Sequence, residues 1–269
     1  MSVFLYRKAS MKKELMRTID SLDKFVRQKS GQELGSTESK ENLEKGLVRI
    51  CVKYKLSPLE IAGSSDGVAY PIQRSVYSNG LLITRNGYFL TSKHCLEGDL
   101  SCASITDSNG VTYPIERLCA FSKRSSIEGD DLALAKAQIP GNNEPMLYRI
   151  YNSKILKNSP VMLMTRNEDG GELKCYYGFT SEDYIRFADV LRGYFSILTD
   201  GGNKGDSGGI VVSSDDEIMG IISKSCNLCE WSHGMSEKTM RFGALATEFM
   251  NALKLVNIYR MVLLKRLHR

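Results

Sequence analysis

Residues 205–209 read Gly-Asp-Ser-Gly-Gly, which places a serine in a glycine-rich turn late in the chain. Two other short segments stand out upstream: residues 90–95 read Leu-Thr-Ser-Lys-His-Cys, and residues 131–134 read Asp-Leu-Ala-Leu. Each segment alone has an ordinary structural explanation, as a loop turn, a structural histidine or the start of a strand. Together they supply a histidine, a carboxylate and a serine in that order, which favours one catalytic site.

A serine, a histidine and an aspartate together suit nucleophilic catalysis, because the serine requires a base and the base requires a carboxylate that orients it. The hydroxyl of Ser207 is a weak nucleophile at neutral pH and needs a neutral imidazole to accept its proton. His94 is the candidate base, since the other two histidines both follow the serine in the chain. A buried carboxylate has to hold the imidazole in the correct tautomer, and we predict Asp131 for this role. Asp130 is the nearest alternative.

The glycines around Ser207 predict a second feature of the site. Without a Cβ atom, glycine allows a tight turn, so that the backbone amides of Gly205 and Ser207 converge on one point. Two N–H donors aimed at one point form an oxyanion hole, and such a donor is worth about 3 to 4 kcal/mol in the transition state.

From Gly46 to about residue 225 the chain alternates short apolar runs with turn residues, which is typical of β proteins. Three hairpins are predicted, and they pair residues 81–84 with 87–92, 103–105 with 111–115, and 210–212 with 218–223. Strands at this spacing, with almost no helix between them, predict an all-β fold of antiparallel barrels or sandwiches.

Both ends of the chain have a helical period instead. Residues 9–29 predict a helical arm whose apolar positions are Leu15, Met16, Ile19, Leu22, Phe25 and Val26. Residues 29–44 are rich in Ser, Gly, Glu and Lys and predict a linker. Residues 247–267 predict a closing helix on the second barrel, with its apolar stripe at Phe249, Ala252, Val256, Tyr259, Leu263 and Leu267. We therefore divide the chain into a helical arm and linker (1–45), a β domain (46–250) and a basic amphipathic helix (251–269).

The net charge of +5 is concentrated at one end of the chain. Five cations lie after residue 253, and they are Lys254, Arg260, Lys265, Arg266 and Arg269. This localisation argues against a nucleic-acid-binding face and indicates a solvated helix end. The alternative is a partner protein or membrane surface that binds the N-terminal arm or the C-terminal helix. No run of about 18 uncharged apolar residues occurs, so a membrane-spanning helix is not expected.

Seven cysteines, an odd number, are scattered without the regular spacing of a secreted disulfide framework. The apolar run at residues 3–6 is too short for a signal-peptide core, so we expect reduced thiols and a cytoplasmic protein. Cys226, Cys229 and His233 have the spacing of half a zinc site, for which Cys175 is a candidate fourth ligand. Free thiols in a surface turn are the favoured interpretation, and we expect no cofactor.

Over residues 75–225 the chain resembles the trypsin-like (chymotrypsin-fold) serine peptidase superfamily, and within it the protease domain of HtrA-type enzymes. The segment from Gly80 to Cys95 resembles their glycine, strand, turn and histidine sequence, and residues 111–114 resemble the hairpin that follows. Residues 199–207 resemble their Thr-Asp lead into the nucleophile, with one residue fewer. The resemblance implies two six-stranded β-barrels with the active site between them. Because few residues follow residue 225, we expect no peptide-binding (PDZ) domain of the kind that HtrA proteins append.

The resemblance also assigns the substrate-binding site to Asp200, Gly201, Ser223 and Ser225, with backbone contacts from Ser223 to an extended peptide. Some residues depart from the trypsin pattern. Gly201 stands where an aspartate would select basic side chains, so specificity is left open. Asp206 is the trypsin-type residue that pairs with a freed N-terminus, yet no activation sequence is recognisable, and Cys95 has no cysteine near residue 80 with which to form a disulfide.

These observations predict a serine endopeptidase that acts on protein or peptide substrates through an acyl-enzyme. The alternative is a protease-shaped module, silent or latent, that binds a peptide or partner without turnover. Latency would arise if the site required cleavage or a partner before Asp206 and the oxyanion loop adopt the active conformation.

Overall fold

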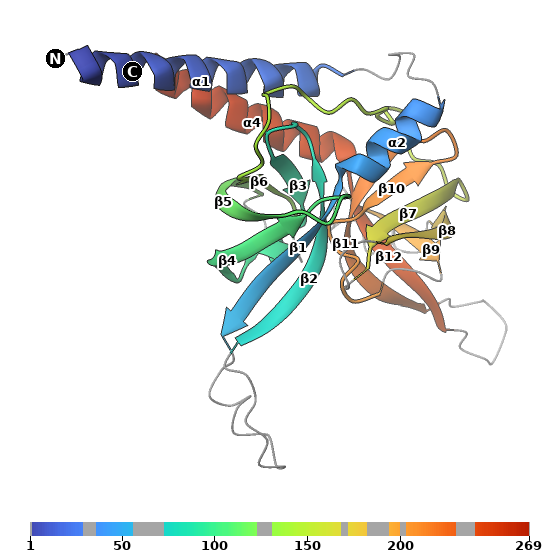
Figure 1. The fold of residues 1–269 in the computed structure, drawn as a ribbon. Coiled ribbons are helices and arrows are strands. Elements are labelled where there is room, and N and C mark those ends of the chain that lie inside the picture. The colour runs from blue at the N-terminus through green and yellow to red at the C-terminus, as the bar shows by residue number, and fades with distance from the viewer. Residues whose placement is uncertain are drawn as a thin grey trace, which may run out of the picture.

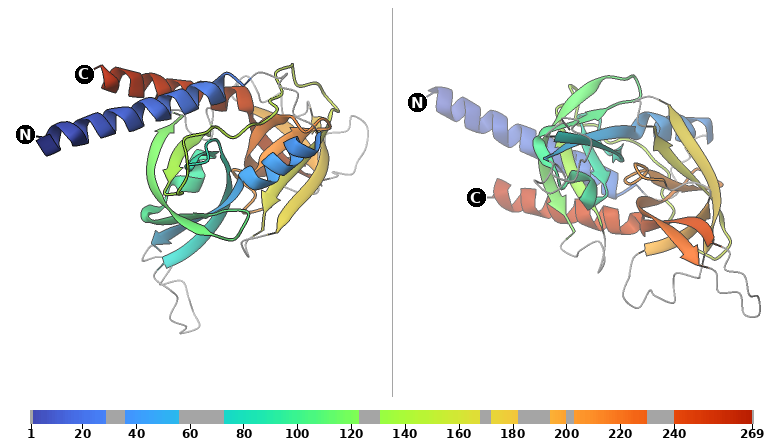
Figure 2. Two further views of the ribbon diagram at one scale, coloured as in Figure 1. Left: turned by 45° about the horizontal axis from the view of Figure 1, so that its top comes forward. Right: turned by 90° about the horizontal axis from the view of Figure 1, so that it is seen from below.

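The computed structural model describes residues 2–28, 36–55, 73–122, 131–167, 172–181, 194–199, 203–229 and 240–268. Two β-barrels lie side by side, with helices along one side of them (Figures 1 and 2). The α-helices of the described residues are α1 (Ser2–Val26), α2 (Ser36–Gly46) and α4 (Phe249–Leu267), and a short 3-10 helix, η1, spans Lys93–Leu96.

The first barrel is closed, and its strands follow the order β1-β2-β3-β6-β5-β4. Its strands are β1 (Leu47–Lys55), β2 (Gln73–Leu82), β3 (Tyr88–Thr91), β4 (Asp99–Thr106), β5 (Thr112–Phe121) and β6 (Ala133–Ala137). The second barrel is closed in the order β10-β11-β12-β9-β8-β7. Its strands are β7 (Pro160–Arg166), β8 (Leu173–Ser181), β9 (Tyr194–Thr199), β10 (Ile210–Ser213), β11 (Ile218–Cys229) and β12 (Met240–Glu248). The prediction of two antiparallel six-stranded barrels is confirmed.

The three predicted hairpins form as expected. β2 pairs with β3, β4 with β5, and β10 with β11, all antiparallel. In the second of these turns, the carboxylate of Asp107 accepts the backbone amides of Asn109 and Val111 at 2.9 Å each, and Gly110 adopts a positive φ of 78°. Turn chemistry of this kind sets the register of a hairpin locally, which is why the sequence pattern predicts it.

Helices α1 and α4 run side by side in both figures and pack against each other (Figures 1 and 2). Phe25 of α1 meets Phe249 of α4 at 6.5 Å and Tyr148 at 6.4 Å in edge-on contacts. The predicted stripe of α4 is buried from Phe249 to Leu263, with Leu267 partly buried. In α1, Ile19, Leu22 and Phe25 are buried, whereas Met16 is 48% exposed.

Helix α4 contacts more of the molecule than the sequence predicted. It packs on β11 and β12 of the second barrel, as expected, but it also packs on β5 and β6 of the first barrel. Tyr259 of α4, for example, lies 6.3 Å from the ring of Tyr88 in the first barrel. The helix is long enough, at 19 residues, to cross from one barrel to the other. Helix α4 therefore joins the two barrels, and α1 packs along α4.

The interval predicted to be a linker contains α2. This helix has a Glu41–Lys45 ion pair one turn apart, and it buries Leu43 completely. Ser39 adds a hydrogen bond from its hydroxyl to the carbonyl of Asp216 at 3.2 Å. With only one fully buried apolar side chain in the segment, no helical period was visible in the sequence. None of the helices within the described residues is apolar and long enough to cross a membrane.

Candidate active site

His94 and Asp131 of the first barrel form a close pair. His94 lies in η1, and Asp131 lies two residues before β6, whose start pairs with the end of β3 next to η1. The imidazole Nδ1 lies 2.5 Å from Asp131 Oδ2, and the His94 backbone amide donates to Oδ1 at 3.1 Å. Only 1% of Asp131 is exposed. The carboxylate is thus held in two places by the residue that it orients.

This pairing shifts both pKa values in the directions expected for an ion pair. Burial by itself raises the pKa of Asp131, but the hydrogen bond and charge of His94 outweigh it and lower the pKa. Burial lowers the pKa of His94, but the hydrogen bonds to Asp131 and Cys95 outweigh it and raise the pKa above 6.5. The arrangement therefore stabilises an imidazolium beside a carboxylate, the charge state that forms when a base accepts a proton.

Ser223 of β11 connects this pair to Ser207. Its hydroxyl donates to Asp131 Oδ2 at 2.7 Å, and its carbonyl accepts a hydrogen bond from the Ser207 hydroxyl at 3.0 Å. The neighbouring carbonyl of Ile222 accepts hydrogen bonds from the Ser92 hydroxyl at 2.8 Å and from the Gly208 amide at 2.7 Å. Two consecutive residues of β11 thus hold the turn that carries His94 (the histidine turn, residues 92–96) against the loop that carries Ser207 (the serine loop, residues 203–209).

The serine hydroxyl and the imidazole are not hydrogen-bonded to each other among the described residues. Ser207 Oγ donates to the Ser223 carbonyl, and the outer imidazole nitrogen, Nε2, lies 3.7 Å from Cys95 Sγ. Contacts between nucleophile and base are often long in proteins without substrate and tighten when substrate binds.

The backbone around Ser207 has the turn that its glycines predicted. Gly205 and Gly208 have positive φ values of 102° and 80°. Within the part of the chain that the structure describes, the amides of Gly205 and Ser207 donate no hydrogen bond. Two unpaired N–H groups beside a candidate nucleophile are what an oxyanion hole requires.

Asn79 of β2, which sequence reasoning missed, holds this loop from the first barrel. Its backbone amide donates to the Ser207 carbonyl at 2.7 Å, and its side-chain Nδ2 donates to the Gly205 carbonyl at 2.8 Å. Its Oδ1 accepts the Arg166 amide at 2.7 Å. Arg49 donates to the same Gly205 carbonyl at 3.3 Å. Asn79 is fully buried, so these contacts are shielded from water.

Asn79→Leu keeps a similar shape and removes both side-chain hydrogen bonds. We expect the free energy of unfolding to fall by about 1 to 3 kcal/mol, since the buried Arg166 amide loses its Asn79 acceptor while the Gly205 carbonyl keeps its contact with Arg49. Denaturant unfolding measures this loss. Asn109→Leu, at an exposed turn position, is the control and is expected to change stability by less than about 0.5 kcal/mol. Equal effects of the two variants would refute the role of Asn79.

Tyr194 at the start of β9 is a second residue that the sequence did not suggest. Its hydroxyl accepts the backbone amide of Asp131 at 2.8 Å. Burial raises the pKa of Tyr194 to about 12, so the hydroxyl stays protonated at neutral pH. The second barrel therefore holds the backbone of Asp131, while Ser223 holds its side chain.

Tyr194→Phe should lower the free energy of unfolding by about 1 to 3 kcal/mol, because it leaves the buried Asp131 amide without an acceptor. Thermal or denaturant unfolding provides the measurement. Tyr177→Phe removes a hydroxyl from a ring that is 77% exposed, and it should be neutral. Equal free energies of unfolding for the two variants would show that the hydrogen bond between Tyr194 and Asp131 does not stabilise the fold.

The protein-family model for Trypsin matches residues 64–242, which is most of the chain. This chain belongs to the Trypsin family. No curated protein matches it. The closer likeness to HtrA-type proteases stays a prediction.

Two residues beside the site of this Trypsin-family chain, Cys95 and Asp206, have contacts that the structure describes. Cys95 is buried and free, so no disulfide fixes the histidine turn. Asp206 is also buried, and one of its carboxylate oxygens accepts the Asn203 amide at 2.7 Å. That contact lies within the serine loop itself, since the Asp206 amide in turn donates to the Asn203 carbonyl at 3.0 Å.

Several predicted positions of this Trypsin-family chain lie outside the described residues. They are Asp130, Asp200, Gly201, His233 and the side chains of Ser225, Cys226 and Cys229. The zinc half-site and most of the substrate pocket therefore stay predictions. Cys175 is exposed and free, and no metal-ligating group of side chains occurs within the described ranges.

Proposed function

We propose that the protein is a serine endopeptidase with Ser207 as nucleophile, His94 as general base and Asp131 as the orienting carboxylate. The observation that carries the proposal is the continuous hydrogen-bond path from His94 through Asp131 and Ser223 to Ser207. Membership of the Trypsin family supports protein or peptide substrates.

In the proposed reaction, Ser207 Oγ attacks the peptide carbonyl carbon as His94 Nε2 takes the hydroxyl proton. Asp131 stabilises the resulting imidazolium, and the amides of Gly205 and Ser207 bind the oxygen that gains negative charge. The imidazolium then gives its proton to the leaving amine, and an acyl-enzyme remains on Ser207. Water, activated by the same histidine, hydrolyses this ester and restores the free serine.

The hydrogen bond from Ser207 to the Ser223 carbonyl favours a second candidate, a latent module that binds peptide without turnover. In this state the nucleophile is bonded to a carbonyl, which accepts no proton from it. A partner or substrate that moved the hydroxyl to His94 would convert the latent form into the active one. We also propose a cytoplasmic location, which would suit the free thiols of the described cysteines.

Incubation with an unfolded protein substrate separates the two candidates. The endopeptidase is expected to release fragments cut at internal bonds, identified by mass spectrometry, and Ser207→Ala is expected to release none. Binding of the same substrate without fragments, at enzyme concentrations that give measurable affinity, would favour the latent module. Fragments that persist in Ser207→Ala would reject the assignment of the nucleophile.

A further inference from the structure

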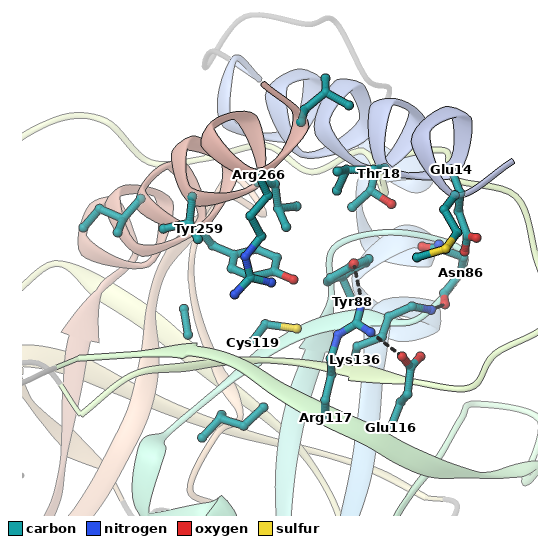
Figure 3. Close-up of a pocket in the computed structure, with 18 of the residues that line it drawn as sticks. Glu14, Thr18, Asn86, Tyr88, Glu116, Arg117, Cys119, Lys136, Tyr259 and Arg266 are labelled. Carbon is teal, nitrogen blue, oxygen red and sulfur yellow. Dashed lines mark hydrogen bonds and ion pairs between the residues drawn. The ribbon is translucent and has the colours of Figure 1, made fainter. Parts of the chain in front are cut away.

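A pocket of about 780 Å³ lies away from the catalytic residues, between helices α1 and α4 and the face of the first barrel formed by β3, β5 and β6 (Figure 3). Small-molecule sites in proteins are typically about 300 to 1,000 Å³. The proposed peptidase reaction uses none of the residues that line it. Figure 3 shows side chains from both helices and from the strands converging on one space.

The pocket carries an excess of positive charge. Lys12, Arg117, Lys136 and Arg266 line it, against the carboxylates of Glu14 and Glu116 alone. Arg117 already has partners, since it binds Glu116 at 2.5 Å and donates to the Tyr88 hydroxyl at 3.4 Å. The remaining cations are therefore the ones available to a ligand.

Among these cations, Lys136 is the one whose surroundings the structure describes in most detail. Its ammonium donates to the carbonyl oxygens of Asn86 and Ala137, and it lies 5.2 Å from the centre of the Tyr88 ring. No carboxylate lies within ion-pair distance of Lys136 or of Arg266 among the described residues. Burial lowers the pKa of Lys136, and the carboxylates of Glu116 and Glu14, which lie beyond ion-pair distance, offset only part of this cost of a half-buried charge. An anion in the pocket would supply a counter-ion in direct contact.

The helical side of the pocket contributes apolar side chains beside the polar and charged ones of Lys12, Glu14, Thr18 and Arg266. Leu15 of α1 and Leu263 of α4 are at least partly buried, and Ile258 and Val262 of α4 are 60% and 40% exposed although they line the pocket. Apolar side chains on two adjacent helices form a surface suited to an alkyl chain. The pocket thus combines a cation of the barrel, Lys136, and a cation of α4, Arg266, with apolar side chains of both helices.

We propose that this pocket binds a single-chain anionic amphiphile, with a carboxylate or phosphate head group at Lys136 and Arg266 and an alkyl tail along α1 and α4. The proposal is independent of the peptidase function. The positive charges of Lys136 and Arg266 favour an anionic head group over a neutral or cationic one. The exposed apolar residues of α4 favour a ligand with an alkyl tail over a fully polar anion.

Calorimetric titration of the full chain with laurate and with dodecyl phosphate, both below micelle-forming concentrations, tests the proposal. We expect one ligand per chain and binding at least about 10-fold tighter than that of dodecyltrimethylammonium, which has the same tail and the opposite charge. Inorganic phosphate alone is expected to bind much more weakly than dodecyl phosphate, because it has no tail.

Two variants locate the site. Lys136→Met and Arg266→Ala should each weaken binding of dodecyl phosphate by about 10-fold or more, because each removes a charge-assisted contact. Lys265→Ala, on an exposed neighbour that does not line the pocket, is the matched control and should bind like wild type. Val262→Trp should also block binding, since it fills the pocket without changing charge. Unfolding midpoints establish that each variant is folded, and Arg266 is exposed, so its substitution is the safest for the fold.

Three results would overturn the proposal. The first is equal affinity for dodecyltrimethylammonium. The second is several ligands per chain, which would indicate a general coating of the exposed apolar residues. The third is unchanged affinity in both Arg266→Ala and Val262→Trp.

Discussion

Replacing Asp131 with asparagine is expected to lower kcat/KM for peptide hydrolysis by about 10⁴-fold while the fold is retained. The carboxylate Oδ2 accepts a hydrogen bond from His94 Nδ1, and an amide nitrogen at that position would force the opposite tautomer on the imidazole. Nε2 would then carry the proton and could accept none from Ser207. Steady-state kinetics on one peptide substrate provides the measurement.

The same substitution should move the pH profile. The pKa of His94 in the native enzyme is raised above 6.5, mainly because Asp131 outweighs the effect of burial. The protonated imidazole is inactive as a base, so kcat/KM should fall as pH falls through this pKa, with its midpoint on the alkaline side of 6.5. In Asp131→Asn the raising effect of Asp131 on the pKa of His94 is lost and only that of Cys95 remains to oppose burial, so the acid limb should move to lower pH. An acid limb that stays in place would contradict the pairing.

Gly208→Ala is expected to reduce both stability and activity strongly. Gly208 has a φ of 80°, and a Cβ atom on it would overlap the carbonyl oxygen of Asn79 and the hydroxyl of Thr91. Both groups are fixed, since Thr91 donates to the Asn79 carbonyl at 2.6 Å. The left-handed backbone costs about 1 to 2 kcal/mol, and relief of the overlap about 1 to 3 kcal/mol more.

Activity should fall further than stability alone explains, by about 100-fold. Gly208 follows the nucleophile, and the chain must shift to accept the methyl group. A displacement of about 1 Å in a reacting group lowers the reaction rate by about 100-fold. Gly110→Ala is a close control, because Gly110 has nearly the same φ, 78°, with open space around its Cβ position. It should show the strain without the overlap. Equal losses in the two variants would contradict the close approach at Gly208.

The sequence predicted best the features that arise from neighbouring residues. Hairpins with a two-residue period and turn residues between the strands were placed correctly, as was the buried stripe from Phe249 to Leu263. Helix α2 was missed because its stability depends on Leu43 and on a contact between Ser39 and Asp216, which is distant in the chain. Local periodicity carries no information about such a contact.

The supporting residues of the candidate site were beyond local reasoning for the same reason. Asn79 is an ordinary strand residue in the sequence, and only the packing of one barrel on the other brings its side chain to Gly205. Tyr194 meets Asp131 across the two barrels in the same way. Ser223 was assigned to substrate contacts through resemblance, and its hydrogen bond to the Asp131 carboxylate became visible in the fold.

Labelling with a fluorophosphonate probe tests the central claim most directly, because the probe reacts with a serine only when a base activates it and an oxyanion hole receives the phosphonyl oxygen. Mass spectrometry of the intact and digested protein should place one adduct on Ser207, with no adduct in Ser207→Ala and little or none in His94→Ala. An adduct of equal yield in Ser207→Ala would contradict the account, since another residue would then be the nucleophile.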